Sequence, residues 1–321
     1  MARRIMVSGA TGLIGAALVR KFASDGCTVA AAVRNVGLAR RMFGGCPNVE
    51  IVEWDVTRPF ARPSGFKVDW FVHAASETAS RSFVEKPVET IRSILHGTEN
   101  ALEAARELGV EAMAFLSTME VYGTPTASPV AEDDYGYLDP VAVRSCYPEA
   151  KRMAENLCVS YAKEFGVPVK IARLAQTFGE GVRYDDARVF AAFARAILER
   201  RDIVLHTDGT TSRCYCYLGD AVSAIETILV KGGGALPYTV ANEETYCSVR
   251  EMAEMLCAEF PESGSKVVFD LSGAEGRGFA PAHRMKLDSS RLRALGWMPK
   301  VGLMEAFRRM IDGWRADRCR P

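Results

Sequence analysis

The sequence shows no surplus of charge of either sign. Its 321 residues include 40 Lys plus Arg and 40 Asp plus Glu, so the formal net charge is zero. No overall electrostatic field would therefore attract nucleic acid or an anionic membrane surface. Long apolar runs are also lacking, since none approaches the ~18 residues of a membrane-spanning helix. Small molecules held by local sites are the expected partners, whereas nucleic acid and membranes are not.

Clustered metal ligands are lacking as well. The four histidines are spread along the chain, at His73, His96, His206 and His283. The nine cysteines contain no Cys-x-x-Cys pattern and have no histidine at metal-ligand spacing, so no metal site is expected. Their odd number and scatter favour reduced thiols. The first strand is expected from about residue 4, which leaves no room for a signal peptide and makes the cytoplasm the expected location.

The most informative local pattern is a glycine-rich turn near the N-terminus. A short apolar strand at 5–7 leads into Gly-Ala-Thr-Gly-Leu-Ile-Gly at 9–15, and the residues that follow have the spacing of a helix. Strand, tight turn and helix in this order place a pyrophosphate at the helix N-terminus, with glycines allowing the turn and the close approach. Taken alone, the run could also be an ordinary glycine-rich turn. The expected dinucleotide contacts are Gly9, Gly12, Leu13, Ile14 and Gly15.

Strand-like and helical patterns alternate along the first half of the chain. Apolar runs of strand character lie at 28–33, 49–52, 70–73, 112–116 and 169–172. Helical patterns separate them, including one at 88–108 that Gly109 ends and one that runs from Pro148 to about residue 165. Parallel strands joined by right-handed crossovers follow from this order, so the expected fold class is α/β with a doubly wound parallel sheet. Farther along, Asp220 is expected to cap a helix at 221–230.

Two residues of one expected helix offer acid–base chemistry. Tyr147 and Lys151 are four residues apart, so they share a helix face and the ammonium is expected near the phenol oxygen. A nearby cation favours phenolate and would lower the pKa of the tyrosine from ~10 toward neutral pH. Thr118 follows the strand at 112–116, at the sheet edge where ligands bind, and could hydrogen-bond the reacting oxygen. Considered alone, Tyr147 and Lys151 could also be an ordinary surface pair.

Several motifs, taken in order, resemble one family. Besides the glycine turn, they are Ser-Thr-x-Glu-Val-Tyr-Gly at 117–123, Tyr-x-x-x-Lys at 147–151 and Leu-Gly-Trp-x-Pro at 295–299. The chain is similar over nearly its whole length to the extended short-chain dehydrogenase/reductases that act as nucleotide-sugar epimerases, dehydratases and decarboxylases, with the nearest resemblance to the UDP-glucuronate decarboxylase branch. The resemblance implies a nucleoside-diphosphate sugar as substrate and a homodimer.

The domain division that the resemblance implies is a large first domain and a smaller second lobe. Residues 1–175 would form an NAD(P)-binding Rossmann domain, and residues 176–321 a mainly substrate-binding lobe. Segments at about 203–241 would return to the Rossmann lobe. No low-complexity linker separates the two parts, so they are expected to fold as one two-lobed unit.

The resemblance also assigns roles to individual residues. It implies that Tyr147 is the base that takes the proton of a sugar hydroxyl, that Thr118 is its hydrogen-bonding partner, and that Lys151 tunes Tyr147 and holds the nicotinamide ribose. Glu120 is a further catalytic candidate, and His73 is expected to be structural. The additional cofactor contacts are expected from Asp55 and Val56 at the adenine and from Ala74 and Ala75 at the phosphates and ribose.

Residues after the second strand bear on the choice of dinucleotide. An acidic side chain there bonds the ribose 2′-hydroxyl of NAD, whereas arginine accommodates the 2′-phosphate of NADP. The chain has Arg34 at this point, with Arg40 and Arg41 close behind. NADP is therefore favoured over NAD. NAD stays open, because Arg34 could instead stack on adenine while the other two arginines form a solvated helix face.

Arginines and one glutamine are the candidates for substrate binding. Arg213 begins Arg-Cys-Tyr-Cys-Tyr-Leu-Gly-Asp, which resembles the stretch by which the family clamps a nucleoside diphosphate. Guanidinium groups suit diphosphate oxygens, although any one of the remaining arginines could equally be a surface charge. Gln176 stands where the decarboxylases carry asparagine. The further arginine candidates are Arg188, Arg277 and Arg284.

The groups after Thr118 bear on the reaction that follows oxidation of the sugar. Dehydratases of the family carry an Asp-Glu pair there, whereas this chain has Met119 and Glu120. Methionine cannot donate a proton, which disfavours dehydration. Decarboxylation of a 4-keto uronate stays open, although Gln176 and the loop at 77–86 depart from the decarboxylase pattern. We expect a nucleotide-sugar epimerase acting through a transient 4-keto sugar, with a nucleotide-uronate decarboxylase or an NADPH-dependent reductase of a keto or aldehyde substrate as alternatives.

Overall fold

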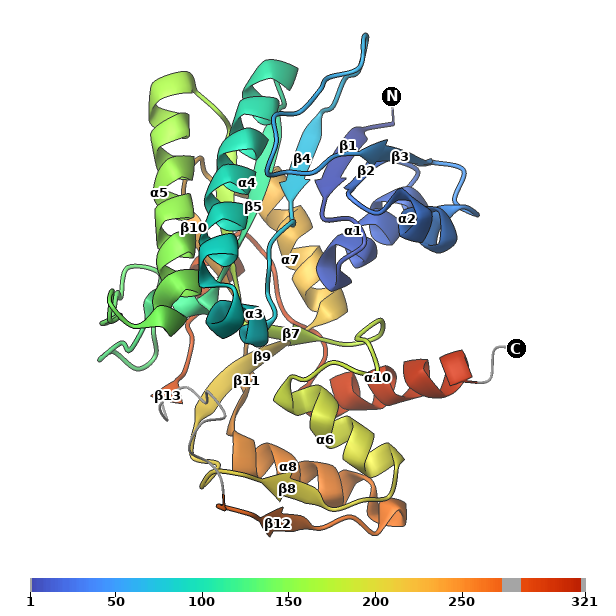
Figure 1. Ribbon diagram of the computed structural model, residues 1–321, viewed down its shortest axis with the longest axis vertical. Helices are drawn as coiled ribbons and strands as arrows, with labels where there is room; N and C mark the ends of the chain where they lie inside the picture. The colour runs from blue at the N-terminus through green and yellow to red at the C-terminus, as the bar shows by residue number, and fades with distance from the viewer. Residues whose placement is uncertain (1, 273–283, 319–321) are drawn as a thin grey trace.

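A seven-stranded parallel sheet dominates the structure, a computed structural model that describes residues 2–272 and 284–318 (Figure 1). Its strand order is β10-β6-β5-β4-β1-β2-β3, and every neighbouring pair is parallel. The expected doubly wound α/β fold is therefore confirmed. In chain order, the strands are β1 (Arg4–Ser8), β2 (Thr28–Val33), β3 (Val49–Glu53), β4 (Trp70–His73), β5 (Ala112–Thr118), β6 (Val169–Leu174) and β10 (Pro237–Val240).

Helices cover both faces of this sheet (Figure 1). α1 (Leu13–Ser24) and α7 (Leu218–Lys231) pack together on one face, and α4 (Pro87–Leu108) and α5 (Cys146–Phe165) pack together on the other. Alternate residues of a strand point to opposite faces, so each strand feeds both cores. In β1, for example, Ile5 belongs to the core beneath α1 and α7, whereas Met6 belongs to the core beneath α4 and α5. The shorter helices of this region are α2 (Val36–Phe43) and α3 (Ser80–Glu85).

A smaller lobe, below the sheet in Figure 1, has its own core. Phe178, Phe190 and Phe307 meet at its centre, with ring centroids 4.7 Å apart from Phe178 to each of the other two. Within the stretch 203–241, α7 and β10 join the layers of the large sheet, whereas β8 and β9 belong to the smaller lobe. The elements of this lobe are β7 (Gln176–Phe178), α6 (Val189–Leu198), β8 (Ile203–Leu205), β9 (Ser212–Tyr217), β11 (Asn242–Ser248), α8 (Val249–Glu259), η3 (Pro261–Ser263), β12 (Val267–Phe269), β13 (Arg284–Met285) and α10 (Leu303–Arg318).

The ends of the two longest helices follow the sequence signals. α4 begins with Pro87 at its first turn and ends at Gly109, whose φ of +63° is the left-handed conformation that glycine adopts readily. α5 ends at Gly166 in the same way, with φ +71°. Both expected stops are confirmed. None of the helices in the described part of the chain combines the length and apolar character that a membrane span requires.

The expectation that Asp220 caps a helix is wrong. The helix begins at Leu218, two residues before Asp220. Asp220 therefore lies in its first turn, and Tyr217 stands at the N-cap. The Asp220 carboxylate instead accepts hydrogen bonds from the backbone N–H groups of Lys300 and Val301, at 3.0 and 2.9 Å. A buried carboxylate is stabilised by such donors, and here they come from a distant segment of the chain. Asp220 therefore fixes the segment that leads into α10.

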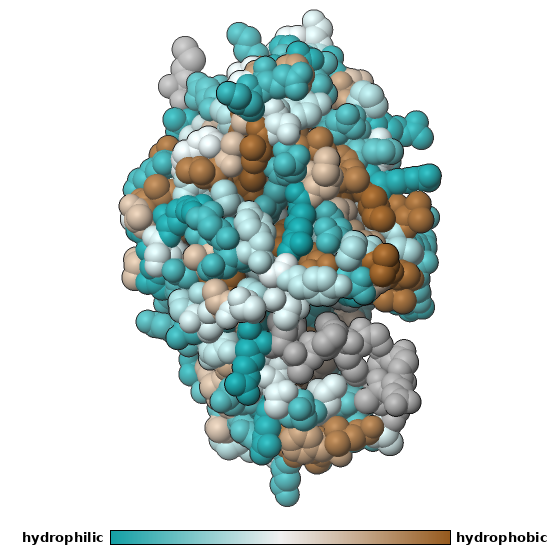
Figure 2. Space-filling model, turned by 90° about the vertical axis from the view of Figure 1, so that its left-hand side faces the viewer, coloured by the Kyte–Doolittle hydropathy of each residue, from teal (hydrophilic) through white to brown (hydrophobic). Residues whose placement is uncertain are grey.

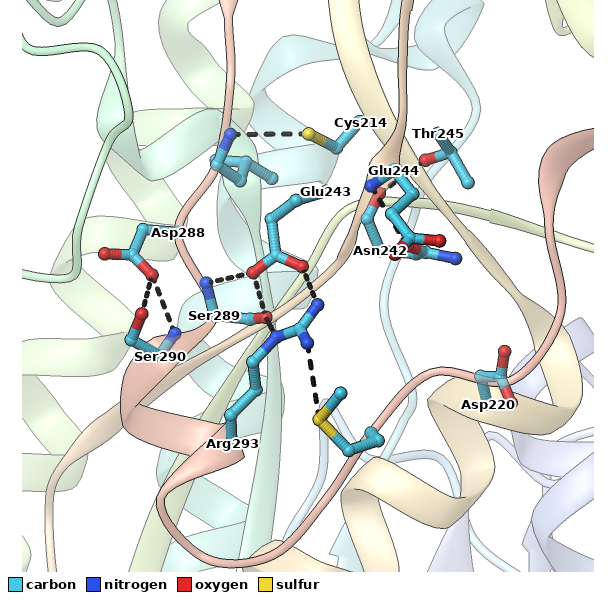
Figure 3. A network of polar contacts seen from close by, with 12 residues as sticks. Cys214, Asp220, Asn242, Glu243, Glu244, Thr245, Asp288, Ser289, Ser290 and Arg293 are labelled. Atoms are coloured by element: carbon cyan, nitrogen blue, oxygen red, sulfur yellow. Dashed lines mark hydrogen bonds and ion pairs between the residues drawn. The ribbon is translucent and has the colours of Figure 1, made fainter.

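A polar network fixes the segment that leads into α9 (Ser290–Arg293) (Figure 3). The Glu243 carboxylate accepts hydrogen bonds from the Ser289 backbone N–H, at 2.9 Å, and from the Ser289 hydroxyl, and it pairs with Arg293. Glu243 lies on β11 of the smaller lobe, whereas α9 packs beside β10 of the large sheet. The network therefore ties the smaller lobe to the edge of the large sheet.

A buried ion pair joins β6 of the large sheet to α5. Arg173 on β6 is fully buried, and its Nη2 lies 2.7 Å from Glu155 Oε2 on α5. Ser117, on β5, donates to the same carboxylate at 2.5 Å. Arg173 Nη1 donates to the Glu132 carbonyl at 2.7 Å, and Nη2 donates to the Tyr135 hydroxyl at 2.8 Å. Every nitrogen of this buried cation thus has a partner, which is what makes its burial tolerable.

Removing the Glu155 charge tests this network. Glu155→Leu should lower the free energy of unfolding by about 3–5 kcal/mol, because it leaves the Arg173 cation buried without its counter-charge. Urea unfolding followed by circular dichroism measures the change. Glu149→Gln, which breaks the half-exposed 3.8 Å pair with Arg152 on the same helix, should cost at most about 1 kcal/mol. Equal losses in the two variants would contradict the role given to the buried pair.

Candidate active site

The glycine turn packs directly against the end of β4. Gly9 has φ +68°, and a Cβ atom placed on it would lie 2.6 Å from the Ala75 Cα. A Cβ on Gly15 would lie 2.2 Å from the Gly9 carbonyl oxygen, so neither position can carry a side chain without a rearrangement. α1 starts at Leu13, and no side chain caps its N-terminus at Gly12. Its first backbone N–H groups are therefore directed to the space above the turn, as a phosphate site requires.

A cavity of about 770 Å³ runs from this turn along the carboxyl ends of β1 to β4. Such a volume is that of a cofactor or ligand site. Asp55 accepts from the N–H and hydroxyl of Thr57, at 3.0 and 2.8 Å, and its charge lies near Arg34. The structure thus brings the predicted cofactor residues of four strand ends together. Those that line this cavity are Gly9, Gly12, Arg34, Asp55, Val56, Ala74 and Ala75.

A second cavity, of about 220 Å³, continues from the first and shares Gly12 and Ala74 with it. It lies where β5 and β6 end, beside the first turn of α5. The predicted catalytic residues all reach it, together with two of the predicted substrate residues and the remainder of the glycine motif. These residues are Leu13, Ile14, Gly15, Thr118, Glu120, Tyr147, Lys151, Gln176 and Arg188.

The turn after β5 arranges three consecutive side chains. Thr118 Oγ1 accepts from the Glu120 backbone N–H at 3.2 Å, which caps the short 3-10 helix η1 (Met119–Tyr122). Met119 is 3% exposed and belongs to the apolar core beneath α1 and α7. The Glu120 carboxylate is half-buried at the cavity wall and accepts from Arg144 Nη2 at 2.9 Å. The turn therefore places the Thr118 hydroxyl and the Glu120 carboxylate at the wall of the catalytic cavity, with the Met119 thioether between them in the sequence.

Tyr147 and Lys151 lie one helical turn apart on the buried face of α5, as predicted. Burial raises the pKa of Tyr147 well above its ordinary value, and the Glu120 carboxylate raises it further. A hydrogen bond with Thr118 and the charges of Arg144 and Arg188 act in the opposite direction. Burial lowers the pKa of Lys151 to about 8.

The expectation that the pKa of Tyr147 is moved toward neutral pH is wrong for this structure, in which burial raises that pKa. The Lys151 ammonium donates to the Leu116 carbonyl at 2.8 Å and lies 4.7 Å above the Phe115 ring. One hydrogen of the ammonium is thus directed to a carbonyl of β5. Because both side chains are enclosed, loss of hydration is the largest influence on the pKa of each, raising that of Tyr147 and lowering that of Lys151.

His73 lies deep in the structure beneath the cofactor cavity. Its Nδ1 is 2.8 Å from the Ser8 hydroxyl, and burial, followed by the charge of Lys151, lowers its pKa to about 3. It is therefore neutral at physiological pH and joins β4 to β1 through its bond with Ser8. Residues 2–272 and 284–318 contain no group of three or more His, Cys, Asp or Glu placed to bind a metal ion.

The predicted substrate residues differ in their surroundings. Arg188 lines the catalytic cavity and is held by the Asp186 carboxylate, at 2.6 Å from Nη2. Arg213, on β9 in the smaller lobe, lines neither of the two cavities described above. Its Nε is buried and has no hydrogen-bond partner in the described part of the chain. Arg284 is exposed on β13, whereas Arg277 lies outside the described residues.

Four residues of the cavity region were missed by the sequence analysis. The Phe83 ring on α3 stacks on the Tyr147 ring, with centroids 4.3 Å apart and planes at 12°. Arg144 contacts Phe83 and Glu120, and Thr78 and Ser80 line the catalytic cavity. The only available signals were the position of Arg144 three residues before Tyr147 and the departure of the loop at 77–86 from the decarboxylase pattern.

Comparisons with known proteins agree with this geometry. The model of the NAD dependent epimerase/dehydratase family matches residues 5–241. UDP-glucuronic acid decarboxylase 1 of Xenopus tropicalis is 30% identical over 98% of this chain and 73% of its own length. UDP-glucuronic acid decarboxylase 3 of Arabidopsis thaliana is 31% identical over 97% of this chain and 89% of its own.

The fold is also that of solved structures of nucleotide-sugar enzymes. A UDP-glucose 4-epimerase of Thermotoga maritima, solved with UDP-glucose, superposes with a TM-score of 0.84 at 22% identity, over 98% of this chain and 99% of the other. The sequence comparisons and the fold comparison thus agree on the same family. The geometry of the chain fits it, with a glycine turn, a Tyr-x-x-x-Lys helix and two joined cavities. The protein is an enzyme of the NAD-dependent epimerase/dehydratase family, in the group of nucleotide-sugar epimerases, dehydratases and decarboxylases.

Proposed function

We propose that the protein is an NAD(P)-dependent nucleotide-sugar epimerase that acts through a transient 4-keto sugar. The make-up of the catalytic cavity carries this proposal. Thr118, Tyr147 and Lys151 line the cavity together, whereas buried Met119 occupies the place of the dehydratase aspartate. A proton can be exchanged with a sugar hydroxyl here, but Met119 cannot donate one to a departing hydroxyl. The set of groups fits oxidation and re-reduction of the sugar.

In the proposed reaction, Tyr147 takes the proton of the sugar hydroxyl while Thr118 hydrogen-bonds the phenol oxygen. Lys151 keeps N–H groups beyond the one bonded to Leu116, and with these it would hold the ribose of the cofactor. When bound, an oxidised nicotinamide would accept a hydride from the sugar and return it to the opposite face, and its positive charge would favour the phenolate. The cofactor would then not be consumed.

The proposed substrate is a nucleoside-diphosphate sugar. Arg188 and Gln176 would contact it in the catalytic cavity. Arg213 would bind the diphosphate, because its buried Nε has no partner in the described residues and a phosphate oxygen is a suitable acceptor. Arg277 and Arg284 stay sequence-based candidates for the same anion. Glu120, at the cavity wall, would act on protons next to the keto group.

We also propose a homodimer formed through the outer faces of α4 and α5. Ile91 on α4 and Met153 and Val159 on α5 are exposed apolar side chains on these neighbouring helices. Figure 2 faces the side of the molecule where α5 lies and shows apolar patches among polar surface in its upper half. The eight cysteines of the described residues are free thiols, which fits a reducing compartment such as the cytoplasm.

A decarboxylase acting on a nucleotide uronate is the second candidate, and the relatives favour it. Both curated relatives named above are UDP-glucuronic acid decarboxylases at 30–31% identity. A 4-keto uronate is a β-keto acid, so its decarboxylation needs the same first oxidation and little further catalysis. In this chain the residues around the sugar differ from that branch at Gln176 and in the loop at 77–86, which is why epimerisation is placed first.

The first test concerns the proposed base. Tyr147→Phe should reduce turnover about 10²-fold or more while cofactor binding is retained, since only the phenol oxygen is removed. Steady-state rates and cofactor titration by fluorescence measure the two effects. Tyr161→Phe is the matched control, because Tyr161 lies on the same helix and bonds Glu103 instead of facing the cavity. Near-normal turnover in Tyr147→Phe would remove the assignment.

The second test concerns the reaction. We expect incubation with UDP-, CDP-, GDP- and dTDP-sugars to interconvert epimers without a lasting change in nicotinamide absorbance, as read by proton NMR. Pentose and CO₂ from a uronate would transfer the assignment to decarboxylation, and steady NADPH loss with a carbonyl substrate would identify a reductase. Accumulation of a 4-keto-6-deoxy sugar would show that the argument from Met119 is wrong.

The third test concerns the cofactor, for which we favour NADP over NAD. Arg34 is exposed at the end of β2 and lines the cofactor cavity, where it could meet a 2′-phosphate. Arg34→Ala should weaken NADP binding by about 1.5–3 kcal/mol and NAD binding much less. Arg40→Ala is the control, since Arg40 does not line that cavity. Calorimetry that shows equal affinity of the unaltered protein for both dinucleotides would remove the preference.

A further inference from the structure

A stack of three side chains lies behind Tyr147, which lines the catalytic cavity. Phe83, on α3, is 1% exposed although α3 is a short surface helix. One face of its ring lies on Tyr147, at 4.3 Å between centroids, and the Arg144 guanidinium lies 4.7 Å from the ring centroid. Flat groups stacked in this way hold each other's orientation. The phenol of Tyr147 is therefore oriented by a residue outside its own helix.

Two hydrogen bonds extend this stack to the rest of the cavity. Arg144 Nη2 donates to Glu120 Oε2 at 2.9 Å, and Cys146 Sγ donates to the Phe83 carbonyl at 3.3 Å. Arg144 belongs to the short helix η2 (Val143–Ser145), which leads directly into α5. Three separate segments, α3, η1 and the start of α5, are thus joined around the catalytic cavity.

We propose that Phe83 and Arg144 form a clamp that positions Tyr147 and Glu120 for proton transfer to and from the sugar. Both are positioning residues, since neither lines the cavity. The inference rests on the proposed function, because it requires Tyr147 and Glu120 to act on the substrate. A displacement of about 1 Å of a reacting group can cost roughly 10²-fold in rate, so fixing these two side chains matters to turnover.

The clamp also sets the charge around the phenol. Three charged groups act on Tyr147 from neighbouring segments: Glu120 on η1 raises its pKa, whereas Arg144 on η2 and Arg188 before α6 lower it. On its own helix, Lys151 is bonded to the Leu116 carbonyl. Because Arg144 pairs with Glu120, it offsets the carboxylate that would otherwise disfavour the phenolate.

The clamp further fixes the loop that carries α3. Thr78 and Ser80 of this loop line the catalytic cavity, so the position of α3 decides where their polar groups meet the sugar. The loop at 77–86 is also where the sequence departs from the decarboxylase pattern. The clamp therefore connects two parts of the site: the loop at 77–86, where the sequence differs from the decarboxylases, and Tyr147, the proposed base.

Hydrogen exchange read by mass spectrometry tests the clamp without any substrate. Phe83→Leu and Arg144→Met should each speed amide exchange in peptides covering 79–86 by about tenfold, because each removes one layer of the stack. The control is Arg250→Met, since Arg250 likewise bonds a glutamate, at 2.7 Å, and lies 5.4 Å from a phenylalanine ring, but on α8 of the smaller lobe. Unchanged exchange in the two clamp variants would overturn the proposal.

Kinetics then separate a positioning role from a merely structural one. With the nucleotide sugar that the panel identifies, Phe83→Leu and Arg144→Met should lower kcat by about 10–10²-fold and change KM less than about threefold. Melting temperature and cofactor affinity should stay near those of the unaltered protein. A normal kcat in the variants whose exchange has increased would overturn the positioning role.

The pH dependence of kcat supplies the sharpest signature. The acidic limb follows loss of the Tyr147 proton, so it should move to higher pH in Arg144→Met and to lower pH in Glu120→Gln, each by about 0.5–1 unit. The double variant should return toward the original position, and Arg144→Lys, which keeps the charge, should stay there. Shifts in the same direction, or none, would overturn the electrostatic part of the clamp.

The same rates separate this inference from the proposed function. If the product is a pentose and CO₂ instead of an epimer, the epimerase assignment fails, yet the effects of Phe83→Leu and Arg144→Met on exchange, kcat and pH dependence are read in the same way. If epimers form and the clamp variants turn over normally, the epimerase assignment stands and the clamp fails.

Discussion

The contact between the Arg173 guanidinium and the Glu155 carboxylate fixes the geometry on which the site depends. It joins β6 to α5, and through Ser117 it also holds the end of β5. Ser117 directly precedes Thr118, and Glu155 lies two turns after Tyr147 on α5. The strand ends and the helix that form the catalytic cavity are therefore held in one register by a charge pair that would be unfavourable to break.

Burial governs the electrostatics of the catalytic cavity in the same way. The pKa of Tyr147 is raised and that of Lys151 is lowered to about 8, because both lose hydration beneath α3 and the sheet edge. In the protein by itself, burial thus shifts both equilibria toward the neutral form, although an amine with a pKa of about 8 stays mostly protonated at neutral pH. Charges that entered with ligands, such as the oxidised nicotinamide and the diphosphate proposed above, would therefore have a large influence on the protonation of this site. Arg144 and Arg188 are the protein's own contribution to that balance.

The sequence allowed the sheet, its strand ends and the residues attached to local motifs to be predicted, because each depends on short-range patterns. Thr118 and Tyr147 belong to this class, since a strand end and a helix turn place them. The stack of Phe83 on Tyr147 could not be predicted, because it joins residues 64 positions apart through an irregular loop. The hydrogen bond of the Lys151 ammonium to a carbonyl of β5 could not be predicted either, since it depends on how the helix is buried against that strand. The role of Asp220 could not be predicted for a related reason, because its hydrogen-bond donors, Lys300 and Val301, lie about 80 residues farther along the chain.

Two of the crossings between the lobes consist of a single residue each. Ala175 alone connects β6 of the large sheet to β7 of the smaller lobe, and Ala241 alone connects β10 to β11. The two crossings lie side by side, since the Ala175 N–H donates to the Val240 carbonyl at 3.0 Å. Ala175 also lines the catalytic cavity, between Leu174 and Gln176. A rotation of one lobe against the other would therefore bend the chain at Ala175, in the wall of the catalytic cavity, so that such a rotation would also change the shape of that cavity.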